Sequence, residues 1–138
     1  MAKHWETFDH PADIGLAARG DSLGELLEAL GEGLARQTCP GAVSPTASKT
    51  VSVEADDVES LTVDFLGELL RLFELQRFLI ARVRVTACDR TSVSAELDGE
   101  TYDPARHELD AEVKAVTYHQ LTIGRQDDGW VGRVILDV

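Results

Sequence analysis

Leucine residues recur at helical spacing after a helix-start signal at Ser22. The signal is a capping box, in which the side chains of Ser22 and Glu25 each accept a hydrogen bond from a backbone N–H at the beginning of a helix. Pro40-Gly41 ends the pattern. The pattern therefore predicts a helix with one apolar face, marked by Leu23, Leu26, Leu27, Leu30 and Leu34.

A second helical pattern begins near Asp56 and has a wider apolar arc. Asp56 and Glu59 repeat the spacing of the first helix start, and apolar residues then recur through Leu61–Phe73. A wide arc is typical of a helix that is covered on most sides. Its narrow polar face carries Asp64 and Glu68, and this face is either simply solvated or part of a docking or cation-binding surface.

Most other segments alternate between apolar and polar residues, as half-buried strands do. Asp98-Gly99 is a strong signal for a two-residue hairpin turn, and Gln126–Gly129 predicts another turn. Hairpin signals outnumber helical crossovers, so the sheets should be mostly antiparallel. We expect one α+β domain over residues 1–138, with mostly antiparallel sheets packed with two main helices. The predicted strands cover residues 3–8, 13–19, 50–55, 78–87, 93–97, 112–123 and 130–138.

The chain is strongly acidic, with 25 Asp and Glu against 13 Lys and Arg and a net charge of -12. This balance argues against direct nucleic-acid binding, because attraction to phosphates requires Lys and Arg on the contact face. It fits a basic partner or a site that holds cations, and it equally fits a surface that is acidic only for solubility.

The sequence shows neither a membrane span nor a signal peptide, so a cytoplasmic protein is expected. Its two cysteines, Cys39 and Cys88, are far apart in sequence, and reduced thiols are the expectation for that compartment.

Candidate chemistry gathers at the two chain ends. The segment 9–13 brings Asp9, His10 and Asp13 together around a proline, as either a capped turn or a site for a hard cation such as Ca²⁺ or Mg²⁺. The last predicted strand ends at Asp137 and Val138, where the α-carboxylate adds another anion. Clustered charges of this kind require a cation or a basic side chain, unless they form an exposed strand end. Lys114, on the neighbouring predicted strand, is a candidate counter-ion.

Four segments resemble the motifs of the archease family, in the family's order and across essentially the whole chain. Residues 9–16, DHPADIGL, resemble the N-terminal DHTADIG signature, with Pro11 for the usual Thr. Residues 57–70 look like the helix motif LLVDWLNELL, with Phe65 for Trp and Gly67 for Asn. Residues 112–119 match EVKAVTYH, and the ending ILDV resembles the family C-terminus.

This resemblance implies a protein cofactor rather than an enzyme. Archeases act as activators of RtcB-type RNA ligases, which join tRNA halves, and they promote guanylylation of the ligase and its multiple turnover. The resemblance also implies a divalent cation, Ca²⁺ in preference to Mg²⁺ or Mn²⁺, held by Asp13, Asp137 and Val138. His10, Lys114 and His119 lie in family motifs and are expected to support this site, while Asp64 and Glu68 are expected to contribute to partner activation. We expect a monomer that contacts neither RNA nor membrane directly.

Two other functions remain open from the sequence. A stand-alone metal-dependent hydrolase would use Asp13, His10 and His119 in an enclosed pocket with a general base. A general chaperone or tRNA-modification modulator would need a sizeable exposed apolar patch. An activating protein would instead present its carboxylates on an exposed protrusion.

Overall fold

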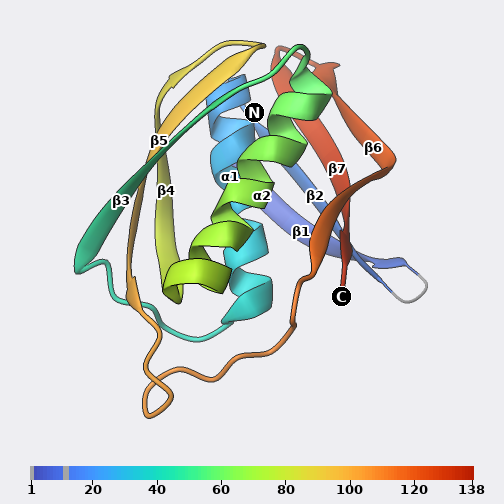
Figure 1. Ribbon diagram of the computed structural model, residues 1–138. Helices are drawn as coiled ribbons and strands as arrows, with labels where there is room; N and C mark the ends of the chain where they lie inside the picture. The colour runs from blue at the N-terminus through green and yellow to red at the C-terminus, as the bar shows by residue number, and fades with distance from the viewer. Residues whose placement is uncertain (1, 11–12) are drawn as a thin grey trace.

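The computed structural model describes residues 2–10 and 13–138, and the side chains of Asp9 and His10 are outside the described part. Two helices lie between two antiparallel sheets (Figure 1). The four-stranded sheet has the order β1-β2-β7-β6, and the three-stranded sheet has the order β3-β5-β4. The elements are β1 His4–His10, β2 Asp13–Gly20, α1 Leu23–Thr38, β3 Ala47–Glu54, α2 Val58–Gln76, β4 Phe78–Cys88, β5 Ser92–Thr101, β6 Ala115–Gln126 and β7 Gly129–Asp137.

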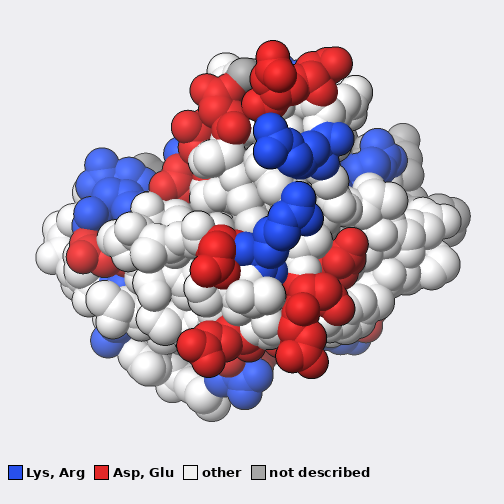
Figure 2. All heavy atoms as spheres, turned by 90° about the horizontal axis from the view of Figure 1, so that it is seen from above, with Lys and Arg blue, Asp and Glu red and all other residues white. Residues whose placement is uncertain are grey.

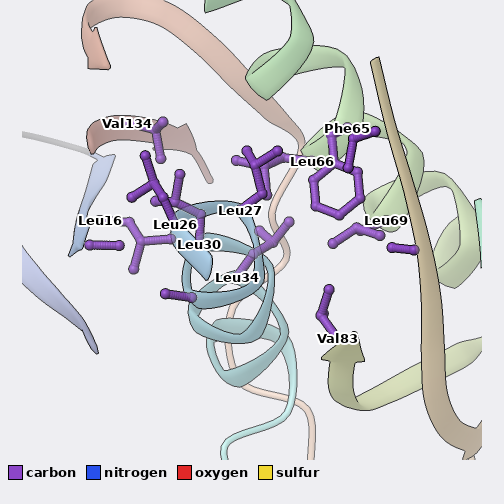
Figure 3. Packing of buried hydrophobic residues seen from close by; sticks show 14 of the residues in the cluster. Leu16, Leu26, Leu27, Leu30, Leu34, Phe65, Leu66, Leu69, Val83 and Val134 are labelled. Carbon is purple, nitrogen blue, oxygen red and sulfur yellow. The ribbon is translucent and has the colours of Figure 1, made fainter. Parts of the chain in front are cut away.

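The predicted α+β fold class is confirmed. One hydrophobic core fills the space between the sheets, with contributions from both helices and both sheets (Figure 3). Alternation along β2 and β7 turns Leu16 and Val134 inward against the leucine face of α1. On the other side of α1, Phe65 and Leu69 of α2 pack near Val83 of β4. No helix in the described part of the chain is long and apolar enough to cross a membrane.

The capping box of α1 is confirmed, whereas the predicted start of α2 is wrong by one residue. The Ser22 hydroxyl accepts a hydrogen bond from the Glu25 N–H at 3.1 Å. At α2 the cap is Asp57 rather than Asp56, and the Asp57 carboxylate accepts from the Ser60 N–H at 2.7 Å. Asp57 is the residue that keeps an extended backbone before the helix, which is the conformation that a cap requires.

The hairpin turn predicted at Asp98-Gly99 is wrong, because both residues lie inside β5. The pairing of β4 with β5 shifts beside them, so that β4 carries an extra residue between Ile80 and Arg82, which is a β-bulge. A Cβ at Gly99 would lie 1.9 Å from the Leu79 carbonyl oxygen, so this glycine permits close approach of two backbones rather than a turn. The other predicted turn is confirmed as the link between β6 and β7.

Side chains of α1 cover the outer edge of β4. The Glu28 carboxylate accepts a hydrogen bond from the Val85 N–H at 2.8 Å, and the Glu32 carboxylate accepts from the Val83 N–H at 3.1 Å. Arg36 donates to a carbonyl oxygen of the same strand. Residues four apart in a helix lie on one face, so these three side chains form a ladder along the strand. The ladder satisfies backbone groups that an edge strand otherwise exposes.

Candidate metal site and acidic groove

The two aspartates predicted as metal ligands lie opposite each other on neighbouring strands. Asp13 is the first residue of β2, Asp137 is the last residue of β7, and the antiparallel register pairs them directly. Because Leu16 and Leu136 point into the core, the alternation of the strands places Asp13 and Asp137 on the outer face of the sheet. Both are half-buried, and Val138 follows with 37% of its surface exposed.

Opposed carboxylates in this arrangement suit a hard cation. Directly opposite residues in an antiparallel pair have Cβ atoms about 4.5–5.5 Å apart, and like charges there are destabilising. Carboxylate oxygens at that spacing are the ligands that Ca²⁺ and Mg²⁺ prefer. The Asp13 and Asp137 carboxylates therefore suit a divalent ion. In the described part of the chain, no three His, Cys, Asp or Glu side chains gather as a metal-binding group.

The supporting residues of the predicted site have different positions. His10 is the register partner of Asp13 at the end of β1, while its side chain lies outside the described residues, as do Pro11 and Ala12. The Lys114 N–H donates to the Asp137 carbonyl oxygen at 2.7 Å, which holds the chain before β6 against the end of β7. This contact is made by the Lys114 backbone, so its side chain is available to another part of the surface.

His119 lies in a wide bulge of β6. Thr117 pairs with Ile135 and Thr122 with Arg133, so residues 118–121 face a single residue of β7. Gln120 has a positive φ of 53°, and His119 is exposed with its N–H directed at the Thr117 hydroxyl at 3.3 Å. The register partner of Asp137 on β6 is Ala115, four residues before His119. The register therefore places His119 further along the strand than the carboxylate pair. The bulge accounts for the exposure of Tyr118, whereas Trp130 is buried. The periodicity of the sequence does not predict the environment of either aromatic residue.

Asp64, Glu68 and Lys114 come together although they belong to separate sequence motifs. They line a groove of about 600 Å³ that is bounded by α2, β3 and the start of β6. Asp64 is exposed and Glu68 half-buried, and Glu68 lies 3.4 Å from the Arg71 guanidinium. Asp64 and Glu68 therefore lie on a solvent-accessible face of α2, as the sequence pattern predicts. Through Lys114 it continues toward Asp137.

Two buried carboxylates were not singled out by the sequence motifs. Asp98 is 4% exposed on β5 and accepts hydrogen bonds from Arg84 at 2.8 and 3.0 Å, from Ser48 at 2.8 Å and from Arg82 at 3.0 Å. These contacts, led by Arg84, hold the pKa of Asp98 well below its ordinary value. A permanently ionised carboxylate is a poor general acid or base at neutral pH. Asp98 therefore organises the three-stranded sheet, and the alternating arginines of β4 are the sequence signal for its partners.

Glu100 similarly anchors the loop before β6. Its carboxylate binds Arg106, the Ser44 N–H at 2.6 Å and the buried His107 ring at 2.9 Å. Arg106 is the main cause that lowers the pKa of Glu100 to about 2, with Ser44 and His107 adding to it. His107 also accepts a hydrogen bond from the Asp103 N–H at 2.9 Å. This histidine is a structural residue of the loop.

The net negative charge is unevenly distributed over the surface. Figure 2 shows one end of the molecule, where a small group of Lys and Arg side chains is flanked by separate groups of acidic ones. At the turns near this end, Arg90 lies 5.0 Å and Arg125 6.0 Å from the centre of the Trp130 ring. Cation–π contacts of this kind place basic side chains over a buried aromatic ring.

Comparisons with known proteins agree over nearly the whole chain. The model of the archease protein family matches residues 5–138. The chain is 36% identical to the protein archease of Methanosarcina acetivorans, over 100% of this chain and 98% of that protein. It is 35% identical to the protein archease of Pyrococcus abyssi, over 99% of each.

Solved structures share the fold. The solution structure of protein 1598 from Methanobacterium thermoautotrophicum superposes with a TM-score of 0.84 at 30% identity, covering 97% of this chain and 98% of that one. A crystal structure from Thermotoga maritima, described as an archease and possible chaperone, has a TM-score of 0.68 at 20% identity and covers 96% of each chain.

Proposed function

The chain belongs to the archease family, and from this premise we propose that it is a non-enzymatic activator of an RtcB-type RNA ligase. In this role it promotes guanylylation of the ligase, and so its repeated turnover, in tRNA splicing or RNA repair. The family match over residues 5–138 supports the proposal, as do the four motifs in family order.

One observation carries the proposal, namely the direct pairing of Asp13 with Asp137 beside Val138. We propose that these residues hold a divalent cation, with Ca²⁺ preferred over Mg²⁺ and Mn²⁺. A cation bound there would offset negative charge on the phosphates during guanylylation. The chain's own task is to orient the oxygen donors. The β2–β7 register fixes the spacing of the two aspartates, and the Lys114 N–H fixes the end of β7.

The position of the pair suits presentation to a large partner. The beginning of β2 and the end of β7 lie together at one end of the four-stranded sheet, near the C-terminus marked in Figure 1. Their side chains face away from the helices. A ligase surface can therefore approach them from outside, with His10, the register partner of Asp13, and His119, further along β6, as supporting residues in the proposal.

The test removes one carboxylate charge at a time without changing side-chain size. Asp13→Asn and Asp137→Asn are expected to weaken Ca²⁺ binding in calorimetry at least about tenfold, since each removes one of three anionic ligands. They are expected to reduce stimulation of guanylylation of the purified ligase by labelled GTP. Adding residues after Val138 should weaken Ca²⁺ binding as well, with the fold unchanged in circular dichroism.

The matched control is Asp127→Asn, an exposed aspartate in the β6–β7 turn whose positive φ of 50° asparagine also tolerates. It should bind Ca²⁺ and stimulate the ligase like the unmodified chain. Full stimulation by either site variant, with Ca²⁺ binding retained, would contradict the proposed site. Absence of any stimulation by the unmodified chain would contradict the proposed function.

A further inference from the structure

The outward face of α2 is flanked by two sheet edges. β3 is at one edge of the three-stranded sheet, and β6 is at one edge of the four-stranded sheet. In Figure 1 this side of the molecule faces the viewer, with α2 visible between β3 and β6. The groove of about 600 Å³ lies here, lined by residues 52–54 of β3, by α2 and by residues 114–116 at the start of β6. Edge strands expose backbone N–H and C=O groups that can pair with another chain.

A second depression extends the groove along α2. It has a volume of about 570 Å³ and is lined by the C-terminal half of α2 and by residues 109–114. Both depressions include Leu70, Glu74 and Lys114, so they form one continuous trough. The trough has an apolar floor, made of Val53, Val63, Leu70, Phe73, Val113 and Val116.

The sides of the trough are predominantly acidic. Six carboxylates line it, against three basic side chains. Of the three, Arg71 is already engaged with Glu68, and the Arg77 guanidinium lies over the Phe73 ring at 5.0 Å. The surplus of negative charge therefore lacks compensation within the trough. The six carboxylates are Glu54, Asp64, Glu68, Glu74, Asp110 and Glu112.

A glycine in the middle of α2 leaves open space in the lining of this trough. Apart from its chain neighbours and the backbone of its own helix, a Cβ placed on Gly67 would have no atom within 4 Å, so the chain itself gives no packing reason for a glycine there. A glycine inside a helix is less favourable than alanine, because it loses more conformational freedom on folding. The space beside Gly67, together with the apolar floor at Leu70, has the form of a pocket for an incoming apolar side chain.

We propose that this trough binds an extended, basic segment of a partner polypeptide. The segment lies along α2 between the β3 and β6 edges, which offer backbone hydrogen bonds to it. One of its apolar side chains occupies the space at Gly67, and its Lys or Arg side chains face the acidic walls. Alternation of apolar and basic residues is the pattern that an extended segment needs to reach both surfaces. This inference does not depend on the cation site at Asp13 and Asp137, and it holds for any partner that carries such a segment.

The experiment uses the full chain and a capped nine-residue probe peptide in which arginine and valine alternate. Binding is measured by fluorescence polarisation, and the contact residues are mapped by backbone NMR shifts. We expect the shifts to be confined to β3, the outward face of α2 and residues 109–116. Gly67→Phe should fill the space and weaken binding at least about tenfold, while helix content and thermal stability are retained because the new Cβ meets no atom from another part of the chain.

Charge reversal supplies the second arm. The double variant Asp64→Lys/Glu74→Lys should weaken binding by about tenfold or more, since it removes two attractive charges and adds two repulsive ones. The control is Glu6→Lys on β1, an exposed carboxylate on the outer face of the other sheet, which changes the net charge as much as either of the two substitutions made singly. It should reduce binding much less. Equal losses for the control and the double variant, or shifts spread over every acidic surface, would overturn the proposal, as would unchanged affinity of Gly67→Phe.

Discussion

The α1 ladder on the edge of β4 leads to a sharp prediction about stability. Glu28→Ala and Glu32→Ala each remove a carboxylate that accepts a hydrogen bond from a strand N–H, at 2.8 and 3.1 Å respectively. Hydrogen bonds to charged groups contribute roughly 1.5–3 kcal/mol. The side chains are 19% and 21% exposed, so water can partly replace the lost acceptor. We therefore expect a loss near the lower end, about 1–2 kcal/mol for each variant.

The assay is urea unfolding at neutral pH, followed by a thermal melt. At about 4 °C per kcal/mol for a chain of this size, each alanine variant should lower Tm by roughly 4–8 °C. Glu28→Gln and Glu32→Gln retain an acceptor and should lose less than half as much. Lys3 lies 3.4 Å from Glu28 and 3.5 Å from Glu32, and these partly exposed ion pairs contribute little. Repeating the series in about 1 M NaCl screens them and should leave the difference between alanine and glutamine in place.

Hydrogen exchange locates the effect. The amides of Val83 and Val85 should exchange faster in the corresponding alanine variants than in the glutamine variants, because their acceptors are gone. Glu108→Ala, which changes an exposed loop carboxylate, is the control for net charge. If alanine and glutamine variants lose the same stability, or no more than Glu108→Ala, the ladder does not stabilise the strand edge.

Further predictions concern glycines, acid stability and thiols. Gly99→Ala should lower the free energy of unfolding by about 2 kcal/mol or more, because the new Cβ would lie 1.9 Å from a backbone oxygen, whereas Gly67→Ala should raise it by up to about 1 kcal/mol in the same urea assay. The pKa of Glu100 is lowered to about 2 from an ordinary 4.5, so its stabilising contribution is complete above pH 4.5 and is lost as the pH falls toward 2. Glu100→Gln should therefore flatten the decline in stability over that range, and an unchanged slope in urea titrations would contradict this assignment. Cys39 and Cys88 are free thiols, the first buried and the second with its pKa raised to about 11, mainly by burial. Both should react with a disulfide reagent at neutral pH far more slowly in the native chain than in urea, and fast native labelling would refute this.

The elements that local patterns define were predictable from the sequence, and the long-range contacts were not. The leucine spacing and Ser22 predicted α1 correctly, because a capping box and an apolar stripe act within one helix. The turn predicted at Asp98-Gly99 is wrong because a turn signal depends only on neighbouring residues. The bulge beside this pair depends instead on the pairing of β5 with β4. The bulge at residues 118–121 likewise depends on the pairing of β6 with β7.

The candidate site shows the same division. Asp13 and Asp137 were identified from motifs, but only the β2–β7 register shows them opposite each other. Lys114 was expected as a side-chain counter-ion, and the structure shows it holding the strand end through its backbone N–H. Lys114 also lines the groove with Asp64 and Glu68, which brings together two distant segments that the periodicity of the sequence does not predict.

The pairing of β2 with β7 also has a consequence for how the chain folds as it is made. The two middle strands of the four-stranded sheet come from residues 13–20 and 129–137, so β2 is synthesised long before its partner. At 5–20 residues per second, the wait on the ribosome is roughly 5–20 s. During that interval α1 and the three-stranded sheet, all encoded between residues 23 and 101, can already assemble. β2 can cover its part of the apolar face of α1 early, and the part that packs near Val134 is covered only when β7 leaves the ribosome.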